Sequence, residues 1–145
     1  MTRFNTLPDH LKDKIKNKED IKNFGTENKL IVPGVMPGMN EIIDQNKIHW
    51  SNYHEIKKDY DDIVSFYAQQ QGIKFFEKVK LNITYYMKNK KKDPDNLCAA
   101  KKFILDGLVK AGVLEDDNWD IVKEFNETWE VDRENPRVEI ELLEV

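Results

Sequence analysis

The chain has little of several features that mark large classes of protein. Cys98 is the only cysteine among 145 residues, which excludes an intrachain disulfide framework and gives no sign of a structural zinc site. No segment approaches the roughly 20 apolar residues of a membrane span, and the charged N-terminus lacks the apolar run of a signal peptide. Repeats, low-complexity tracts and Gly/Ser linkers are also missing. These absences predict one soluble, cytoplasmic domain in a reducing compartment.

Charge is abundant, and its two signs are separated along the chain. The formal net charge of −4 argues by itself against nucleic-acid binding. From residue 74 to residue 92, however, seven lysines accompany the single acid Glu77, and from residue 114 onward twelve acids accompany three bases. A metal-dependent enzyme acting on a polyanion needs lysines to gather phosphates and carboxylates to hold the cation. The alternative is a solvated, lysine-rich hairpin.

Hydrophobic periodicity predicts an α/β (α+β) fold, with a mixed β-sheet and packed helices in the order β-α-β-α-β-β. Strands are expected at residues 28–35, 77–88, 120–132 and 137–145, and the main helices at 51–70 and 96–112. Asn52 and Glu55 fit a capping box at the start of the first of these helices, and Gly112 would end the second. A weak pattern over residues 40–47 and the spacing of Leu7, Leu11 and Ile15 indicate two shorter helices.

The segment KNKKKDPDNLCAAKK, residues 88–102, sets four lysines before two aspartates at the start of a predicted helix. Local structure accounts for the aspartates, with Asp93 as N-cap, Pro94 at the first helical position and Asp95 favoured by the helix dipole. It does not account for the lysines or for a second acidic cluster, LEDDNWD, beyond the far end of the helix. An EF-hand is excluded because its glycine and terminal glutamate are missing. Two or three carboxylates that converge beside a phosphate are sufficient for Mg²⁺.

Helix geometry indicates which lysine could contact that phosphate. On a continuous helix, Lys102 comes seven residues after Asp95, within about 20° of it around the axis, and its side chain leans toward the N-terminus. Lys101 instead falls on the apolar stripe, where its stem is expected to be covered and its amine to reach water. The alternative for Lys102 is a simple surface pair with Asp106, four residues later.

Residues 93–122 resemble the active-site segment of the RusA-type Holliday junction resolvases. That family's pattern is Asp-x-Asp-Asn-Leu, a lysine-bearing helix with Leu-Asp-Ala/Gly-Leu, a glycine-containing turn and an Asp-Asp or Asn-Asp pair. The flanking segments VPGVMPGMNE and PRVEIEL are compatible with it over about residues 28–143. The resemblance therefore implies a RusA-like nuclease domain at residues 28–145, preceded by an N-terminal helical extension at residues 1–27.

Position by position, the resemblance makes Asp93, Asp95 and Asp117 the metal-binding carboxylates, with Asp116 as a neighbour of unassigned role. The first-described members place the catalytic lysine four residues after the second aspartate, where this chain has alanine. Counting back from LDGL assigns that role to Lys102, and Lys101 remains the alternative.

The resemblance further implies a Mg²⁺-dependent endonuclease, with Mn²⁺ as a substitute, of the kind that phages or prophages usually encode. Such an enzyme acts as a homodimer and cuts two opposed strands of a four-way junction, so a bacterial or phage-infected cytoplasm is expected. Metal-assisted hydrolysis needs no histidine, and the three histidines are given no role.

The basic segment and the tryptophans complete the expectations. Four lysines are predicted to contact the backbone of a DNA arm, giving affinity without sequence choice: Lys88, Lys90, Lys91 and Lys92. Trp119 and Trp129 are interpreted as core or dimer-interface residues, the interface being the C-terminal strand pair, in preference to base-stacking platforms. Two other functions remain open: a branched-DNA-binding protein without catalysis, and a structural or partner-binding protein.

Overall fold

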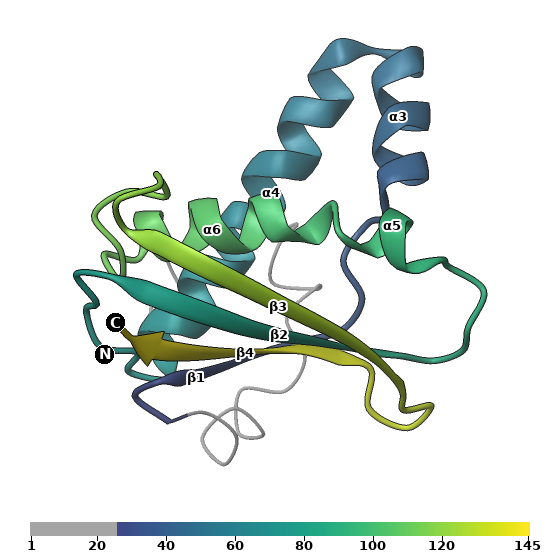
Figure 1. The fold of residues 1–145 in the computed structure, drawn as a ribbon. Coiled ribbons are helices and arrows are strands. Elements are labelled where there is room, and N and C mark those ends of the chain that lie inside the picture. Colours follow the sequence, from purple (N-terminus) through teal and green to yellow (C-terminus); the bar gives the residue numbers. More distant parts are fainter. Residues whose placement is uncertain (1–25) are drawn as a thin grey trace.

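The structure, a computed structural model, describes residues 26–145 apart from the side chains of residues 45–48 and 50. The helix predicted from Leu7, Leu11 and Ile15 lies outside this range. At each place where the sequence predicts an α element between strands, the structure has two consecutive helices (Figure 1). The elements are β1 (Lys29–Pro33), α3 (Met39–Ile48), α4 (Trp50–Gln70), β2 (Val79–Met87), α5 (Pro94–Leu97), α6 (Ala100–Lys110), β3 (Val122–Val131) and β4 (Arg137–Glu144). The predicted element order and α+β fold class are confirmed.

The four strands form one mixed sheet in the order β1-β4-β2-β3. β4 runs antiparallel to both of its neighbours, β1 and β2. β3 is parallel to β2, and α5 and α6 form the connection between these two strands. The last strand is therefore internal, while β1 and β3 form the edges. β3 and β4, predicted as a strand pair, are separated by β2, so that pairing is wrong.

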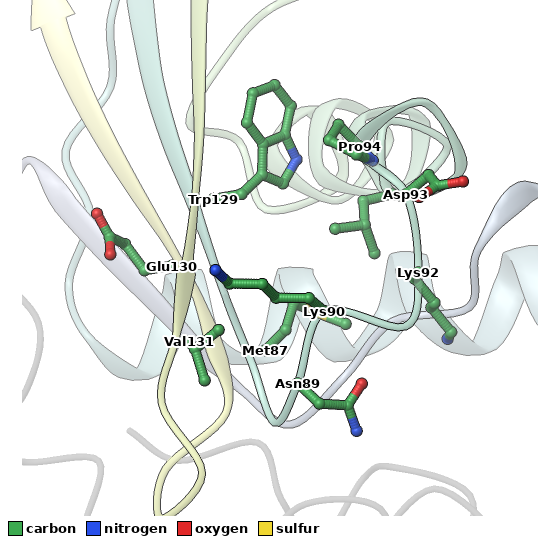
Figure 2. Close-up of a pocket in the computed structure, with 10 residues that line it drawn as sticks. Met87, Asn89, Lys90, Lys92, Asp93, Pro94, Trp129, Glu130 and Val131 are labelled. Carbon is green, nitrogen blue, oxygen red and sulfur yellow. The ribbon is translucent and has the colours of Figure 1, made fainter.

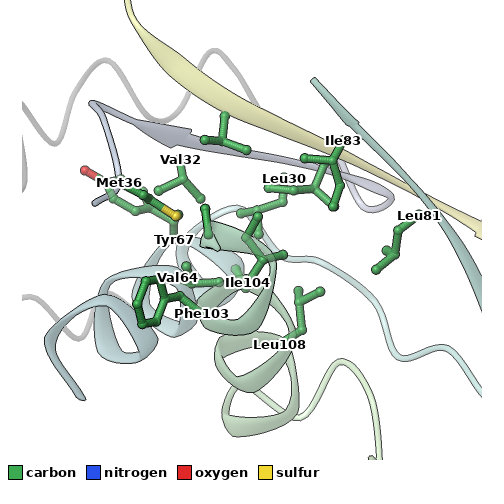
Figure 3. Close-up of a cluster of buried hydrophobic side chains, with 14 of the residues drawn as sticks. Leu30, Val32, Met36, Val64, Tyr67, Leu81, Ile83, Phe103, Ile104 and Leu108 are labelled. Carbon is green, nitrogen blue, oxygen red and sulfur yellow. The ribbon is translucent and has the colours of Figure 1, made fainter. Parts of the chain in front are cut away.

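One face of the sheet carries the core. Alternate residues of β2 are buried, as the sequence predicted, because side chains on a strand point to opposite faces in turn. In the core these β2 residues pack with α4 and α6 (Figure 3). A Cβ atom on Gly107 of α6 would lie 2.5 Å from the Val64 side chain and 3.0 Å from the Asp61 carbonyl oxygen. The two helices thus approach more closely than any larger residue at position 107 would allow.

Two predicted helix boundaries differ from the structure. α4 begins with His49 as N-cap, whose ring accepts a hydrogen bond from the Ser51 amide at 3.2 Å. The predicted capping box of Asn52 and Glu55 is therefore wrong, since both positions lie inside the helix. α4 continues to Gln70 with Ile63, Val64 and Tyr67 in the core. α3 with the first part of α4 forms a helical hairpin that projects beyond the sheet (Figure 1).

The helix predicted over residues 96–112 is broken after Leu97. The amides of Lys101 and Lys102 bond to carbonyl oxygens three residues back, at 3.1 and 3.3 Å, instead of four. This tight turn changes the angular relation of residues on its two sides. The expectation that Asp95 and Lys102 share one face of a continuous helix is therefore wrong. Among the helices that the structure describes, none has the length and apolar composition of a membrane-spanning segment.

Candidate active site

Asp93 precedes α5 and Asp95 lies in its first turn, at the end of the loop that follows β2. Asp93 is the N-cap and Pro94 takes the first helical position, as predicted, but the Asp93 carboxylate makes no capping hydrogen bond. Asp95 accepts a local bond from the Asn96 amide at 2.9 Å. Both carboxylates are exposed, and they line one hollow together with Met39, Asn40, Lys91, Lys92 and Asn96. Two of the predicted metal ligands are therefore side by side and open to a ligand.

Asn96 holds this acidic turn against the start of α3. Its Oδ1 accepts a hydrogen bond from the Asn40 amide at 2.8 Å. A Cβ on Gly38 would lie only 2.7 Å from the same oxygen, so a larger residue at that position would displace the Asn96 side chain. The PGMN and DPDN segments thus form one surface. The sequence shows both segments, but no local pattern indicates that they touch.

Asp117 lies in the turn after α6, which brings it back alongside that helix. Lys102 Nζ is 3.7 Å from Asp117 Oδ2 and 3.3 Å from Asp106 Oδ1. Asp106 also pairs with Lys57 at 2.7 Å. Burial alone would raise the pKa of the Asp106 carboxyl, but hydrogen bonds from Lys57 and Lys102 hold it below its usual value. Lys102 therefore lies beside Asp117, one of the predicted metal ligands, and the alternative pair with Asp106 forms as well.

The three predicted carboxylate ligands are not assembled into one cluster. Within residues 26–145, no group of three acidic, histidine or cysteine side chains is arranged to hold a metal ion. Asp93 and Asp95 share a hollow at the start of α5, whereas Asp117 lies beside Lys102 on α6. Their hard carboxylate oxygens suit Mg²⁺. The Asp93 carboxylate makes no capping hydrogen bond and is therefore available as a ligand. The donor chemistry fits this cation, and the described conformation holds the donors in two groups.

Lys101 was expected to reach water from an apolar stripe, but its amine is bound to β3. Its Nζ lies 2.6 Å from Glu127 Oε1 and 5.0 Å from the centroid of the Phe125 ring. The Tyr85 hydroxyl donates to the other Glu127 oxygen at 2.8 Å. Burial alone would raise the pKa of the Glu127 carboxyl, but hydrogen bonds from Lys101 and Tyr85 hold it below its usual value. Glu127, which the sequence did not indicate, thus joins the start of α6 to the sheet.

The basic loop lies next to the acidic turn. Lys88, Lys90 and Lys91 are exposed, while Lys92 pairs with Glu41 of α3. Lys91 and Lys92 share the hollow of the two aspartates. The loop therefore places positive charge where a phosphate near Asp93 and Asp95 would lie.

The two tryptophans lie at the surface. Trp119, in the turn after α6, is 93% exposed, so its interpretation as a core residue is wrong. Trp129 lies on the edge strand β3 and is 41% exposed. It stacks on Tyr85, with ring centroids 6.5 Å apart and an interplanar angle of 12°.

Comparison with known proteins gives one match to a family. The family model described as endodeoxyribonuclease RusA matches residues 44–143. The match covers more than half of the chain and includes the basic loop, the acidic turn, Lys102 and Asp117. No curated protein matches the chain.

Proposed function

Because the chain belongs to the RusA family of endodeoxyribonucleases, we propose that it is a metal-dependent, structure-selective endonuclease that resolves Holliday junctions in recombination and repair. It would hydrolyse phosphodiester bonds in branched DNA. One observation carries this proposal: Asp93 and Asp95 are open to a ligand in a single hollow with Lys91 and Lys92. Carboxylates that can hold a cation thus lie beside amines that can hold a phosphate.

We propose Asp93, Asp95 and Asp117 as the residues that hold Mg²⁺, with Mn²⁺ as a substitute. A bound ion would supply Lewis-acid chemistry and lower the pKa of a water molecule. The chain's own contribution is to hold the phosphate and to stabilise charge as it develops. The Lys102 amine suits the second task because its hydrogen bond with Asp106 raises the pKa of the amine and keeps it protonated.

The exposed loop lysines would hold the DNA without reading its sequence. Lys88, Lys90 and Lys91 carry charge that contacts with backbone phosphates would neutralise, which gives affinity that falls with salt. Lys92 would contribute less because it already pairs with Glu41.

A homodimer is part of the same proposal. A four-way junction has two-fold symmetry, so two opposed cuts are matched by a C2 dimer with one active site in each subunit. The outer edge of β3 has no neighbouring strand in the described sheet and offers a place at which a second copy could pack.

The proposal is tested with a synthetic four-way junction and a duplex of the same sequence, each with Mg²⁺. The wild-type protein should cut the junction and spare the duplex. Asp117→Asn should abolish cleavage but keep junction binding, because the amide removes the charge of a proposed metal ligand. Asp120→Asn, at an exposed acid three residues away, is the matched control and should cut at the wild-type rate.

Results that differ from these expectations would lead to different conclusions. Wild-type cleavage by Asp117→Asn would show that the assignment of the metal site is wrong. Junction binding without cutting by the wild-type protein would identify a non-catalytic branched-DNA-binding protein. No binding to junctions at about 50 mM salt, where contacts with phosphates are strong, would favour a structural or partner-binding protein.

A further inference from the structure

The helix-facing side of the edge strand β3 is only partly covered. The register pairs Trp129 with Tyr85 and Val131 with Met87, so these β3 side chains share the sheet face that carries the core. The ion pair between Lys101 and Glu127 joins α6 to the middle of β3. Beyond that pair, toward the end of the strand, Trp129 and Val131 stay partly exposed.

A hollow of about 580 Å³ opens at this uncovered end, between β3 and the loop that leads from β2 to α5 (Figure 2). Its apolar wall includes Trp129, Pro94 and Leu97, and its polar wall includes Lys90, Lys92 and Asp93. The volume is within the range of small-ligand sites. Asp93 connects this hollow to the acidic turn of the candidate active site.

Trp129 contacts a buried ring and is also partly exposed to the hollow. It stacks on Tyr85, which is 1% exposed and held by its hydroxyl bond to Glu127. Trp129 also lines the hollow. Figure 2 shows the Glu130 side chain directed away from Trp129, while the Lys90 side chain extends across the end of β3. The hollow thus combines a flat aromatic surface with a nearby cation.

We propose that this hollow binds one unpaired nucleobase of branched DNA, stacked on Trp129, with the adjoining phosphate contacting Lys90. The proposal rests on the proposed function and adds a source of selectivity to it. A nucleotide joins a flat ring to an anion, and the hollow offers a flat ring and an amine. In an uninterrupted duplex each base is paired and stacked, so entering the hollow would require extrusion. A base pair at the centre of an open four-way junction lacks a stacking neighbour on one side, so freeing its base costs less.

The fluorescence of Trp129 reports directly whether a base stacks on its ring. In a Trp50→Phe, Trp119→Phe background, Trp129 is the only tryptophan of the chain. Adding a thymidine oligonucleotide without divalent metal should quench its fluorescence. Unchanged fluorescence at a DNA concentration that saturates binding would overturn the proposal.

Two substitutions separate ring stacking from simple apolar packing. Trp129→Leu should bind the oligonucleotide about 5- to 150-fold more weakly, which is the effect of losing one base–aromatic stack. Trp129→Phe keeps an aromatic face and should retain most of the affinity. Phe75→Ala removes an exposed aromatic residue just before the opposite end of β2 and should leave affinity unchanged. Thermal unfolding of each variant identifies any loss that comes from misfolding.

The comparison of substrates completes the test. Trp129→Leu should reduce the preference for a four-way junction over a duplex by the same factor, with affinity for the duplex little changed. Equal binding of unpaired DNA by Trp129→Leu and wild type would refute the nucleobase site. If Trp129→Leu also altered the sedimenting mass, the hollow would be a protein contact.

Failure of this inference and failure of the proposed function give different results. Quenching is measured without metal and requires no cleavage. A wild-type protein that shows quenching but cuts no junction with Mg²⁺ would refute the nuclease function and leave the nucleobase site. A protein that cuts junctions without quenching of Trp129 would refute the nucleobase site alone.

Discussion

Replacing Lys101 and Lys102 one at a time should produce opposite phenotypes, although the two residues are adjacent. Lys101→Ala removes the amine that lies 2.6 Å from Glu127, whose side chain is 12% exposed. The carboxylate keeps its bond from the Tyr85 hydroxyl but loses its cation. Leaving a largely buried charged group without one partner costs about 1–3 kcal/mol. We expect the free energy of unfolding to fall by that amount, or Tm by about 2–4 °C per kcal/mol, with cleavage little changed below the transition.

Lys102→Ala should have a small effect on stability and a large effect on cleavage. The Lys102 side chain is 58% exposed, so its surface pairs contribute under about 1 kcal/mol. Asp106 also keeps its other partner, Lys57. Losing one contact with charge that develops in the transition state costs about 2–4 kcal/mol, a fall of about 30- to 1,000-fold in cleavage rate. Junction affinity should change little.

The two lysines also differ in how they affect stability at low pH. Because the pKa of Glu127 is lowered from its usual 4.5 in the folded protein, its interactions stabilise the fold above that pH. Their contribution is lost as the pH falls through the lowered pKa. Without the Lys101 amine the pKa of Glu127 should rise, so the stability difference between wild type and Lys101→Ala should shrink on acidification. Lys102→Ala should leave the Glu127 contribution intact.

Denaturant unfolding at several pH values and single-turnover cleavage of a four-way junction measure both properties. Lys58→Ala, at an exposed lysine of α4, is the control for the loss of a surface lysine. Slow cleavage with normal stability in Lys101→Ala, together with destabilisation in Lys102→Ala, would refute the assignment. Lys101 would then be the catalytic lysine.

Two further predictions concern DNA affinity and assembly. Replacing Lys90 and Lys91 by Ala should weaken DNA binding uniformly across sequences and flatten the log–log salt dependence by about 0.9 for each lost phosphate contact, whereas an unchanged slope would identify these lysines as solvated surface residues. Sedimentation velocity should give twice the chain mass of 17.2 kDa, and a clean monomer at micromolar concentration would contradict the proposed homodimer.

The strands were predictable because burial on one face leaves a period of two in the sequence. In β2, apolar residues alternate with polar ones, and this alternation indicates which face of the strand packs against the core. The apolar residues are Val79, Leu81, Ile83 and Tyr85. The break between α5 and α6 was not predictable in this way. Cys98 and Ala99 both have helical backbone angles, and neither is a glycine or proline that would mark an interruption.

The site was predictable only where its residues are close in sequence. The DPDN turn and its lysines form a local pattern, whereas the contact of Asn96 with Gly38 and the pairing of Lys101 with Glu127 depend on how the sheet and helices pack. The placement of Lys102 assumed a continuous helix, yet the turn after α6 brings Asp117 to it. The interpretation of Trp119 as a core residue was wrong because the sequence alone does not show that the turn after α6 faces water.

The position of β4 bears on the biosynthesis of the protein. Ile140 of β4 pairs with Leu30 of β1 on one side and with Ile83 of β2 on the other, and all three are buried. The two flanks of the sheet meet only through this strand, which follows every other strand in the chain. A ribosome adding about 5–20 residues per second needs roughly 5–20 s to proceed from β1 to β4. For that interval β1 lacks the strand with which it pairs, and its apolar residues stay exposed to chaperones and proteases until β4 emerges.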